Sequence, residues 1–131
     1  MNPRITIIDD DANVRIIAAT LLELRDFSVR TLSGSQIDPA SLDDTDLVLL
    51  DLETSGVNGL RTVQELHRQF DRRDRPRLIV AVPADAPDTE RFAHRIRPDA
   101  ILHKPFDPRA LIRTVEELLG RCDDQPAADA G

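Results

Sequence analysis

Acidic side chains and a lysine directly follow apolar runs at three places in this sequence. Asp9, Asp10 and Asp11 follow the first apolar run, Asp51 follows the third and Lys104 follows the fifth. Carboxylates packed together raise each other's pKa, and a hard divalent cation relieves that cost. Mg²⁺ prefers one or two carboxylates, some waters and a substrate phosphate, and a lysine neutralises a phosphoryl oxygen. If these ends meet, the sequence predicts a Mg²⁺-dependent phosphoryl-transfer site.

The composition supports a role for this lysine. Lys104 is the only lysine among the 17 Lys and Arg residues, which favours a specific function over an ordinary surface position. Asp51 follows a nearly continuous apolar run, so its carboxylate is expected at the buried end of a strand. Asp11 is also a candidate N-cap for a helix that follows it.

Five apolar runs alternate with five segments of helical character. The predicted strands are 5–8, 28–32, 47–50, 78–82 and 100–103, and the predicted helices are 12–24, a short one near 39–42, 60–70, 87–96 and 108–119. Strands that alternate with helices predict an α/β fold with a parallel sheet between helices. Five such units predict a flavodoxin-like, doubly wound sheet of strand order 2-1-3-4-5 with five helices. Ligands bind such sheets at the carboxyl ends of the strands, which is where the charged residues lie.

Length and composition limit the number of domains and the classes of binding partner. The chain has 131 residues, of which 40% are hydrophobic and 31% charged, as expected for one globular domain. We assign residues 1–121 to this domain and 122–131 to a flexible tail or the start of a linker. A net charge of -7 and an aromatic content of 3% argue against direct binding of nucleic acid. No run approaches a membrane span, and the single Cys122 suggests the reducing cytoplasm.

Three segments together resemble a known family. The segments are IIDDD at 7–11, LVLLDLETSGVNG at 47–59 and LHKPF at 102–106. In this order, at the ends of these strands, they resemble the receiver domain of bacterial two-component response regulators. The resemblance covers roughly residues 4 to 120.

The resemblance implies a role for each matching residue. Asp51 matches the aspartate that accepts a phosphoryl group from a sensor histidine kinase or a histidine phosphotransfer protein. Asp10 matches the direct Mg²⁺ ligand, Asp9 its neighbour that acts through water, and the backbone carbonyl of Glu53 the third protein ligand. Lys104 matches the lysine that pairs with the acceptor carboxylate or the phosphoryl group, and the peptide bond after it is often cis in that family.

The resemblance also implies a signalling component rather than a metabolic enzyme. A receiver catalyses only its own phosphorylation and dephosphorylation. Its partners are the kinase or phosphotransfer protein and a downstream protein target, and it is a monomer or a weak homodimer.

The sequence departs from the family at the positions that transmit the signal. The family has Ser or Thr at the end of the fourth strand, whose hydroxyl contacts the phosphoryl group. Counting from Pro76 puts Ala81 at that place, and counting back from Lys104 puts Val82 there. The aromatic residue expected on the fifth strand is Ile101. Phosphorylation is therefore predicted to remain possible, while the conformational readout is in doubt.

Rival hypotheses come from different classes of protein. The first is an atypical receiver that acts as a phosphorylation-independent interaction module, which the missing hydroxyl and aromatic favour. The second is a haloacid-dehalogenase-like phosphatase, which also uses acids after the first strand, but Asn13 stands where that family has Thr or Val. A flavodoxin proper is disfavoured because no phosphate-binding loop rich in Ser, Thr and Gly follows the first strand.

Two further features have structural and functional interpretations. His67, His94 and His103 lack metal-ligand spacing and are predicted to be surface or partly packed residues. On the first predicted helix, Val14, Ile17, Ala18 and Leu21 form the expected inner stripe. Ile16, Ala19 and Leu22 lie off it, which suits either the docking of a partner helix or ordinary packing.

Overall fold

Five parallel strands form the centre of the protein, in the order β2-β1-β3-β4-β5. We analysed a computed structural model that describes residues 2–33, 42, 44–52, 64 and 76–120. The strands are β1 (Arg4–Ile8), β2 (Ser28–Leu32), β3 (Leu47–Asp51), β4 (Arg77–Pro83) and β5 (Ala100–Lys104). The predicted sheet, its parallel pairing and its strand order are therefore confirmed.

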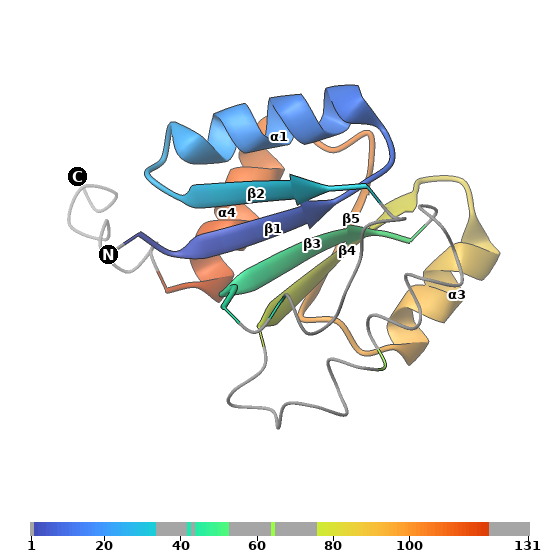
Figure 1. Ribbon diagram of the computed structural model, residues 1–131. Coiled ribbons are helices and arrows are strands. Elements are labelled where there is room, and N and C mark those ends of the chain that lie inside the picture. Colours follow the sequence, from blue (N-terminus) through green and yellow to red (C-terminus); the bar gives the residue numbers. More distant parts are fainter. Residues whose placement is uncertain (1, 34–41, 43, 53–63, 65–75, 121–131) are drawn as a thin grey trace, which may run out of the picture.

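Helices cover both faces of this sheet (Figure 1). They are α1 (Ala12–Glu23), α3 (Pro87–Arg95) and α4 (Pro108–Leu118), and α1 and α4 lie on one face while α3 lies on the other. The short helix expected near 39–42 lies almost entirely outside the described residues. The helix expected over 60–70 and the tail at 122–131 fall outside them too, apart from residue 64, so these remain predictions. In the described part of the chain, no helix is long and apolar enough to cross a membrane.

The alternation of side chains along the strands divides the core into two layers. One layer, beneath α1 and α4, contains Ile7, Leu49 and Leu102. The other, beside α3, contains Ile8 and Leu50. Because successive strand residues point to opposite faces, this alternation also decides which face each residue at the end of a strand belongs to.

Local signals set the beginnings of the helices. Asp11 accepts hydrogen bonds from the backbone nitrogens of Asn13 and Val14, and Asp107 accepts one from that of Arg109. Both are N-caps, as predicted for Asp11, because a carboxylate satisfies amide groups that have no partner within the helix. After α4, Gly120 has a φ of +75°, a conformation that glycine adopts readily at the end of a helix.

The inward face of α1 differs from the predicted one. The buried residues are Ala18 and Leu22, whereas Ile17 is 58% exposed and Ile16 is 62% exposed. The predicted inner stripe is therefore wrong for Ile17, and for Leu22 the alternative of ordinary packing is the correct one. Ala18 and Leu22 are four residues apart and lie on one line along the helix, so α1 contacts the sheet along this line and turns Ile17 outwards.

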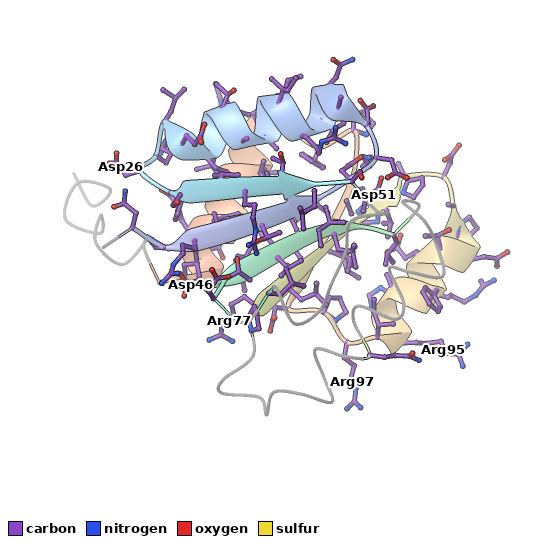
Figure 2. All side chains as sticks on the ribbon, viewed as in Figure 1. Asp26, Asp46, Asp51, Arg77, Arg95 and Arg97 are labelled. Carbon is purple, nitrogen blue, oxygen red and sulfur yellow. The ribbon has the colours of Figure 1, made fainter. Side chains whose placement is uncertain are left out.

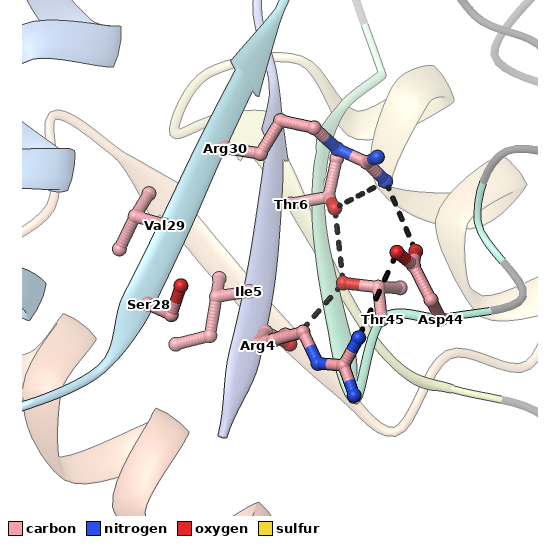
Figure 3. Close-up of a pocket in the computed structure, with 8 residues that line it drawn as sticks. All are labelled: Arg4, Ile5, Thr6, Ser28, Val29, Arg30, Asp44 and Thr45. Atoms are coloured by element: carbon pink, nitrogen blue, oxygen red, sulfur yellow. Dashed lines mark hydrogen bonds and ion pairs between the residues drawn. The ribbon is translucent and has the colours of Figure 1, made fainter. Parts of the chain in front are cut away.

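A polar network fixes the segment that leads into β3 (Figure 3). The hydroxyls of Thr6 and Thr45 lie 2.9 Å apart, and Arg30 Nη2 donates to Thr6 Oγ1 at 3.2 Å. Asp44 lies between Arg30 at 3.6 Å and Arg4 at 3.7 Å, at the edge of a cavity of about 140 Å³. The hydroxyls are buried and paired, so they hold this segment against β1 at the amino end of the sheet.

Candidate functional site

Lys104 connects the ends of three strands at the carboxyl edge of the sheet. Its Nζ lies 3.0 Å from Asp51 Oδ2 and 3.1 Å from Asp9 Oδ2. Asp51 is the last residue of β3, Lys104 is the last of β5, and Asp9 directly follows β1. Figure 2 shows Asp51 at this edge, while Asp46 and Arg77 lie at the opposite one. The predicted meeting of Asp9, Asp51 and Lys104 is thus present in the structure.

The turn between β1 and α1 holds Asp9 in place. The carboxylate of Asp9 accepts a hydrogen bond from the backbone nitrogen of Asp11 at 2.8 Å, through the oxygen that does not bind Lys104. Arg15 Nη1 donates to the backbone carbonyl of Asp9 at 2.6 Å. Asp10 is exposed in the same turn. Asp9 is thereby fixed on the inner side of the turn and Asp10 on its outer side.

Burial makes the carboxylate of Asp9 costly to ionise. The side chains of Asp9 and Asp51 are only 5% and 8% exposed. Burial raises the pKa of Asp9 above its ordinary value of 3.8, and the charge of Asp51 raises it further, against hydrogen bonds from Asp11 and Lys104. Burial alone lowers the pKa of Lys104, but its hydrogen bonds to Asp51 and Asp9 prevail and raise it above 10.5. The site therefore stabilises a positive charge.

The donor set of this site fits a hard divalent cation. Asp9 and Asp51 offer carboxylate oxygens that one ammonium group balances only in part, and Asp10 adds a further negative charge in the adjoining turn. The described residues contain no cluster of three or more His, Cys, Asp or Glu side chains able to hold a metal. Mg²⁺ does not require one, because it keeps several waters and takes one or two carboxylates. Glu53, whose carbonyl is the third expected ligand, lies outside the described residues.

The register of the sheet decides whether Ala81 or Val82 stands where the family has a Ser or Thr hydroxyl. Asp51 pairs with Ala81 across β3 and β4. Residues paired in this way point to the same face of a sheet, so Ala81 shares a face with Asp51. Val82 packs in the opposite core layer, as does Ile101. Ala81 is therefore the residue beside Asp51, and its side chain is a methyl group.

An apolar groove opens next to Lys104. It has a volume of about 700 Å³, and its apolar lining includes Val14, Ile17 and Leu21 from α1 and Phe106 from the β5–α4 connection. Asp11 and Asp85 add acidic groups to its lining. The exposure of Ile17, which the predicted stripe missed, is explained by its place in this groove.

Sequence reasoning missed two side chains that support the site. The first is Arg15, whose contact with the backbone carbonyl of Asp9 depends on the path of the turn rather than on any motif. The second is Glu90, whose Oε1 lies 2.6 Å from His103 Nε2.

The Lys104–Pro105 peptide bond is cis, as the family resemblance implies. His94 and His103 are exposed, as predicted, with side chains 67% and 46% accessible.

Comparisons with known proteins agree with this architecture. The family model of the response regulator receiver domain matches residues 5–116. The response regulator SaeR of Staphylococcus aureus is 31% identical over 116 residues, which make up 88% of this chain and 50% of that protein. The chain thus spans about half the length of the curated relatives it matches.

Solved structures agree at the level of the fold. A response regulator receiver protein from Burkholderia phymatum is 27% identical, with a TM-score of 0.74 over 91% of this chain and 96% of that one. The BeF3-activated DrrB receiver domain has a TM-score of 0.77 at 21% identity, covering 92% of this chain and 100% of that one. Together with the family match and the meeting of Asp9, Asp51 and Lys104, these likenesses show that the chain belongs to the response regulator receiver domain family.

Proposed function

We propose that this receiver accepts a phosphoryl group on Asp51 from a phosphohistidine of a sensor histidine kinase or a phosphotransfer protein. The observation that carries the proposal is the position of Lys104 Nζ, within 3.1 Å of both Asp9 and Asp51. A lone ammonium group so placed restrains the acceptor carboxylate and remains within reach of a phosphoryl oxygen. Asp51 is largely buried, so its approach to phosphorus is restricted to the open edge of the sheet.

The transfer exchanges one bond to phosphorus for another. A carboxylate oxygen of Asp51 forms a bond to phosphorus while the bond from phosphorus to the donor imidazole nitrogen breaks, and the imidazole leaves with the electron pair of that bond. Lys104 then exchanges its contact with the Asp51 carboxylate for a phosphoryl oxygen. Catalysis of this kind consists of positioning and electrostatic stabilisation.

The proposed cofactor is Mg²⁺, which when bound would neutralise the charge that the phosphoryl oxygens share with the acceptor. Asp9, Asp10 and Asp51 and the backbone carbonyl of Glu53 would hold it. The raised pKa of Asp9 supports this assignment, because the carboxylate is buried beside a second negative charge. A divalent cation would relieve that repulsion.

The groove beside Lys104 suits the docking of the phosphoryl donor. Ile17 and Leu21 of α1 and Phe106 contribute an apolar floor next to Lys104, and Asp11 and Asp85 favour a partner that carries basic residues beside its apolar ones. A donor helix in this groove would bring its phosphohistidine to the open edge at Asp51.

A second candidate function is a phosphorylation-independent interaction module. The observation in its favour is that Ala81 beside Asp51 carries no hydroxyl and Ile101 carries no aromatic ring. Such a module would keep the fold and a partner surface while leaving the acceptor unused.

Intact-protein mass after incubation with acetyl phosphate tests the proposal. The wild-type protein is expected to gain one phosphoryl group when Mg²⁺ is present and none after chelation with EDTA. Asp51→Asn should gain none. Asp46→Asn is the matched control, because Asp46 directly precedes β3 whereas Asp51 ends it, and this variant should react like the wild type. Folded wild-type protein that never forms the adduct under rapid quenching would favour the interaction module.

A further inference from the structure

A side-chain hydrogen bond joins the end of β5 to α3. His103 Nε2 lies 2.6 Å from Glu90 Oε1, and His94 Nε2 lies 3.6 Å from Glu90 Oε2. His103 belongs to the outermost strand of the sheet, and Glu90 and His94 belong to α3. Neither the family resemblance nor the spacing of the residues predicts this contact.

The contact holds the half of α3 that the core does not hold. Near its carboxyl end, α3 is anchored by Ala93, which is fully buried, and by Ile96, which is 9% exposed. At its amino end, the N-cap Ala86 has no side-chain hydrogen bond, and Pro87 and Asp88 are exposed. The bond from Glu90 to His103 therefore restrains the amino-terminal half of α3 against the sheet.

The same contact is one residue away from the phosphoryl-transfer site. His103 and Lys104 are consecutive in β5, so their side chains point to opposite faces of the sheet. Lys104 reaches Asp51 and Asp9 on one face, and His103 reaches Glu90 on the other. Any shift of the β5 backbone that accompanies the movement of Lys104 towards a phosphoryl oxygen would also move His103.

The residues that usually relay such a shift have no polar group here. The side chain of Ala81, beside Asp51, is a methyl group. Val82 and Ile101 pack among apolar side chains on the α3 face. In the described part of β4 and β5, His103 makes the polar side-chain contact with α3.

We propose that the pair of His103 and Glu90 couples occupancy of the phosphoryl site to the position of α3, in place of the hydroxyl and aromatic residues that the sequence lacks. This inference rests on the proposed function of Asp51. The pair exists in the arrangement in which Lys104 binds Asp51. Its loss should therefore favour the arrangement in which Lys104 binds a phosphoryl oxygen.

Further charged side chains of α3 lie around this contact. Glu90 faces His103 from β5 and His94 from its own helix, while Arg91 pairs with Asp88 on the exposed side of α3. β4 meets α3 through apolar residues such as Val80 and Val82.

Amide NMR spectra of the full chain, titrated with beryllofluoride and Mg²⁺, test the coupling. Signals of Asp9 and Lys104 report occupancy of the site, and signals of residues 88–92 report the response of α3. In the wild type the site signals and the α3 signals of residues 88–92, the positions after Pro87 that carry an amide hydrogen, should shift together. Glu90→Gln and His103→Gln should bind beryllofluoride about two- to five-fold more tightly, the range that an exposed ion pair allows. Their α3 signals should shift less at equal occupancy.

The matched control is Asp88→Asn, which removes an acid from the same helix without touching the pair. This variant should behave like the wild type. Unchanged or weaker affinity in the Glu90 and His103 variants, or a full α3 response in them, would overturn the coupling. If the wild-type site signals themselves fail to shift, the proposed function fails, and the coupling with it.

Discussion

Asp51 and Ala81 are direct neighbours across β3 and β4, and both lie on the face of the sheet that α1 and α4 cover. A hydroxyl at residue 81 would therefore lie beside the proposed acceptor. We expect Ala81→Ser to bind beryllofluoride about ten-fold or more tightly than the wild type, because a hydrogen bond to a charged group contributes about 1.5–3 kcal/mol. Isothermal titration calorimetry in excess Mg²⁺ measures the change.

Val82→Thr is the control for this substitution. Val82 is fully buried in the opposite core layer, so a hydroxyl there should leave beryllofluoride affinity unchanged. It should instead lower the free energy of unfolding by about 1–3 kcal/mol, the cost of burying an unpaired hydroxyl. If Val82→Thr tightened binding and Ala81→Ser did not, the register argument would be wrong.

Lys104 should govern stability at alkaline pH. The pKa of Lys104 in the folded protein lies above the ordinary value of 10.5. Its contribution to the free energy of unfolding is therefore complete below pH 10.5 and is lost as the pH rises through the folded pKa. Because the chain has one lysine and no tyrosine, and thiols and α-amino groups titrate roughly two units lower, the loss can be assigned to Lys104. Urea unfolding followed by circular dichroism between pH 9.5 and about 12 measures it.

Lys104→Met is the comparison for this measurement. It should be less stable by about 1–3 kcal/mol at pH 8, since it leaves two carboxylates without their shared ammonium. Its free energy of unfolding should not fall with the wild-type slope above pH 10.5. Parallel curves for the two proteins would show that the two contacts of Lys104 contribute nothing to stability.

The sequence predicted the strand ends because a simple rule governs them. Apolar runs that stop at a charged residue mark buried strands, and parallel strands bring their carboxyl ends together. This rule was sufficient to place Asp9, Asp51 and Lys104 at one edge. It located each strand to within about a residue, since the strand that we expected to stop at Leu50 includes Asp51.

The sequence alone could not decide which residues pair across neighbouring strands or how a helix is rotated about its own axis. Counting from Pro76 and from Lys104 gave different residues beside Asp51, because the count does not show where the backbone pairing starts. Similarly, α1 carries apolar residues around much of its circumference, so periodicity alone did not show that Leu22 faces inwards and Ile17 outwards. Both ambiguities disappear once hydrogen bonds and packing fix the relative positions of the elements.

Asp9 is expected to lower the stability of the metal-free protein and to contribute to metal binding. Its raised pKa means that ionisation costs folding energy, and this cost grows as the pH rises from 3.8 through the folded pKa. Without Mg²⁺, Asp9→Asn should therefore be more stable than the wild type at pH 7. The difference should shrink towards pH 4.

Magnesium should reverse which of the two proteins, wild type or Asp9→Asn, is the more stable. A ligand at ten times its Kd stabilises the folded state by about 1.4 kcal/mol, and Asp9→Asn should lose most of this gain. Thermal unfolding with and without Mg²⁺ measures both effects, and Asp46→Asn should keep the full gain. An equal Mg²⁺ gain in wild type and Asp9→Asn would remove Asp9 from the metal site.

The groove at α1 makes a prediction about the phosphoryl donor. Ile17 lines this groove, whereas Leu24, which is 74% exposed, lies just beyond the end of the same helix and does not. Ile17→Glu should slow transfer from the cognate phosphorylated kinase, once phosphotransfer profiling identifies it. We expect a loss of about ten-fold or more, since a charge at a buried contact typically costs more than 1.4 kcal/mol.

Transfer from acetyl phosphate provides the internal reference, because this small donor needs no docking surface. Its rate should be equal in Ile17→Glu, Leu24→Glu and wild type, which also shows that the acceptor site is intact. Both substituted side chains are exposed, so the free energy of unfolding should change by less than about 0.5 kcal/mol. If Leu24→Glu slowed transfer from the kinase as much as Ile17→Glu, or if neither slowed it, the donor would dock elsewhere on the receiver.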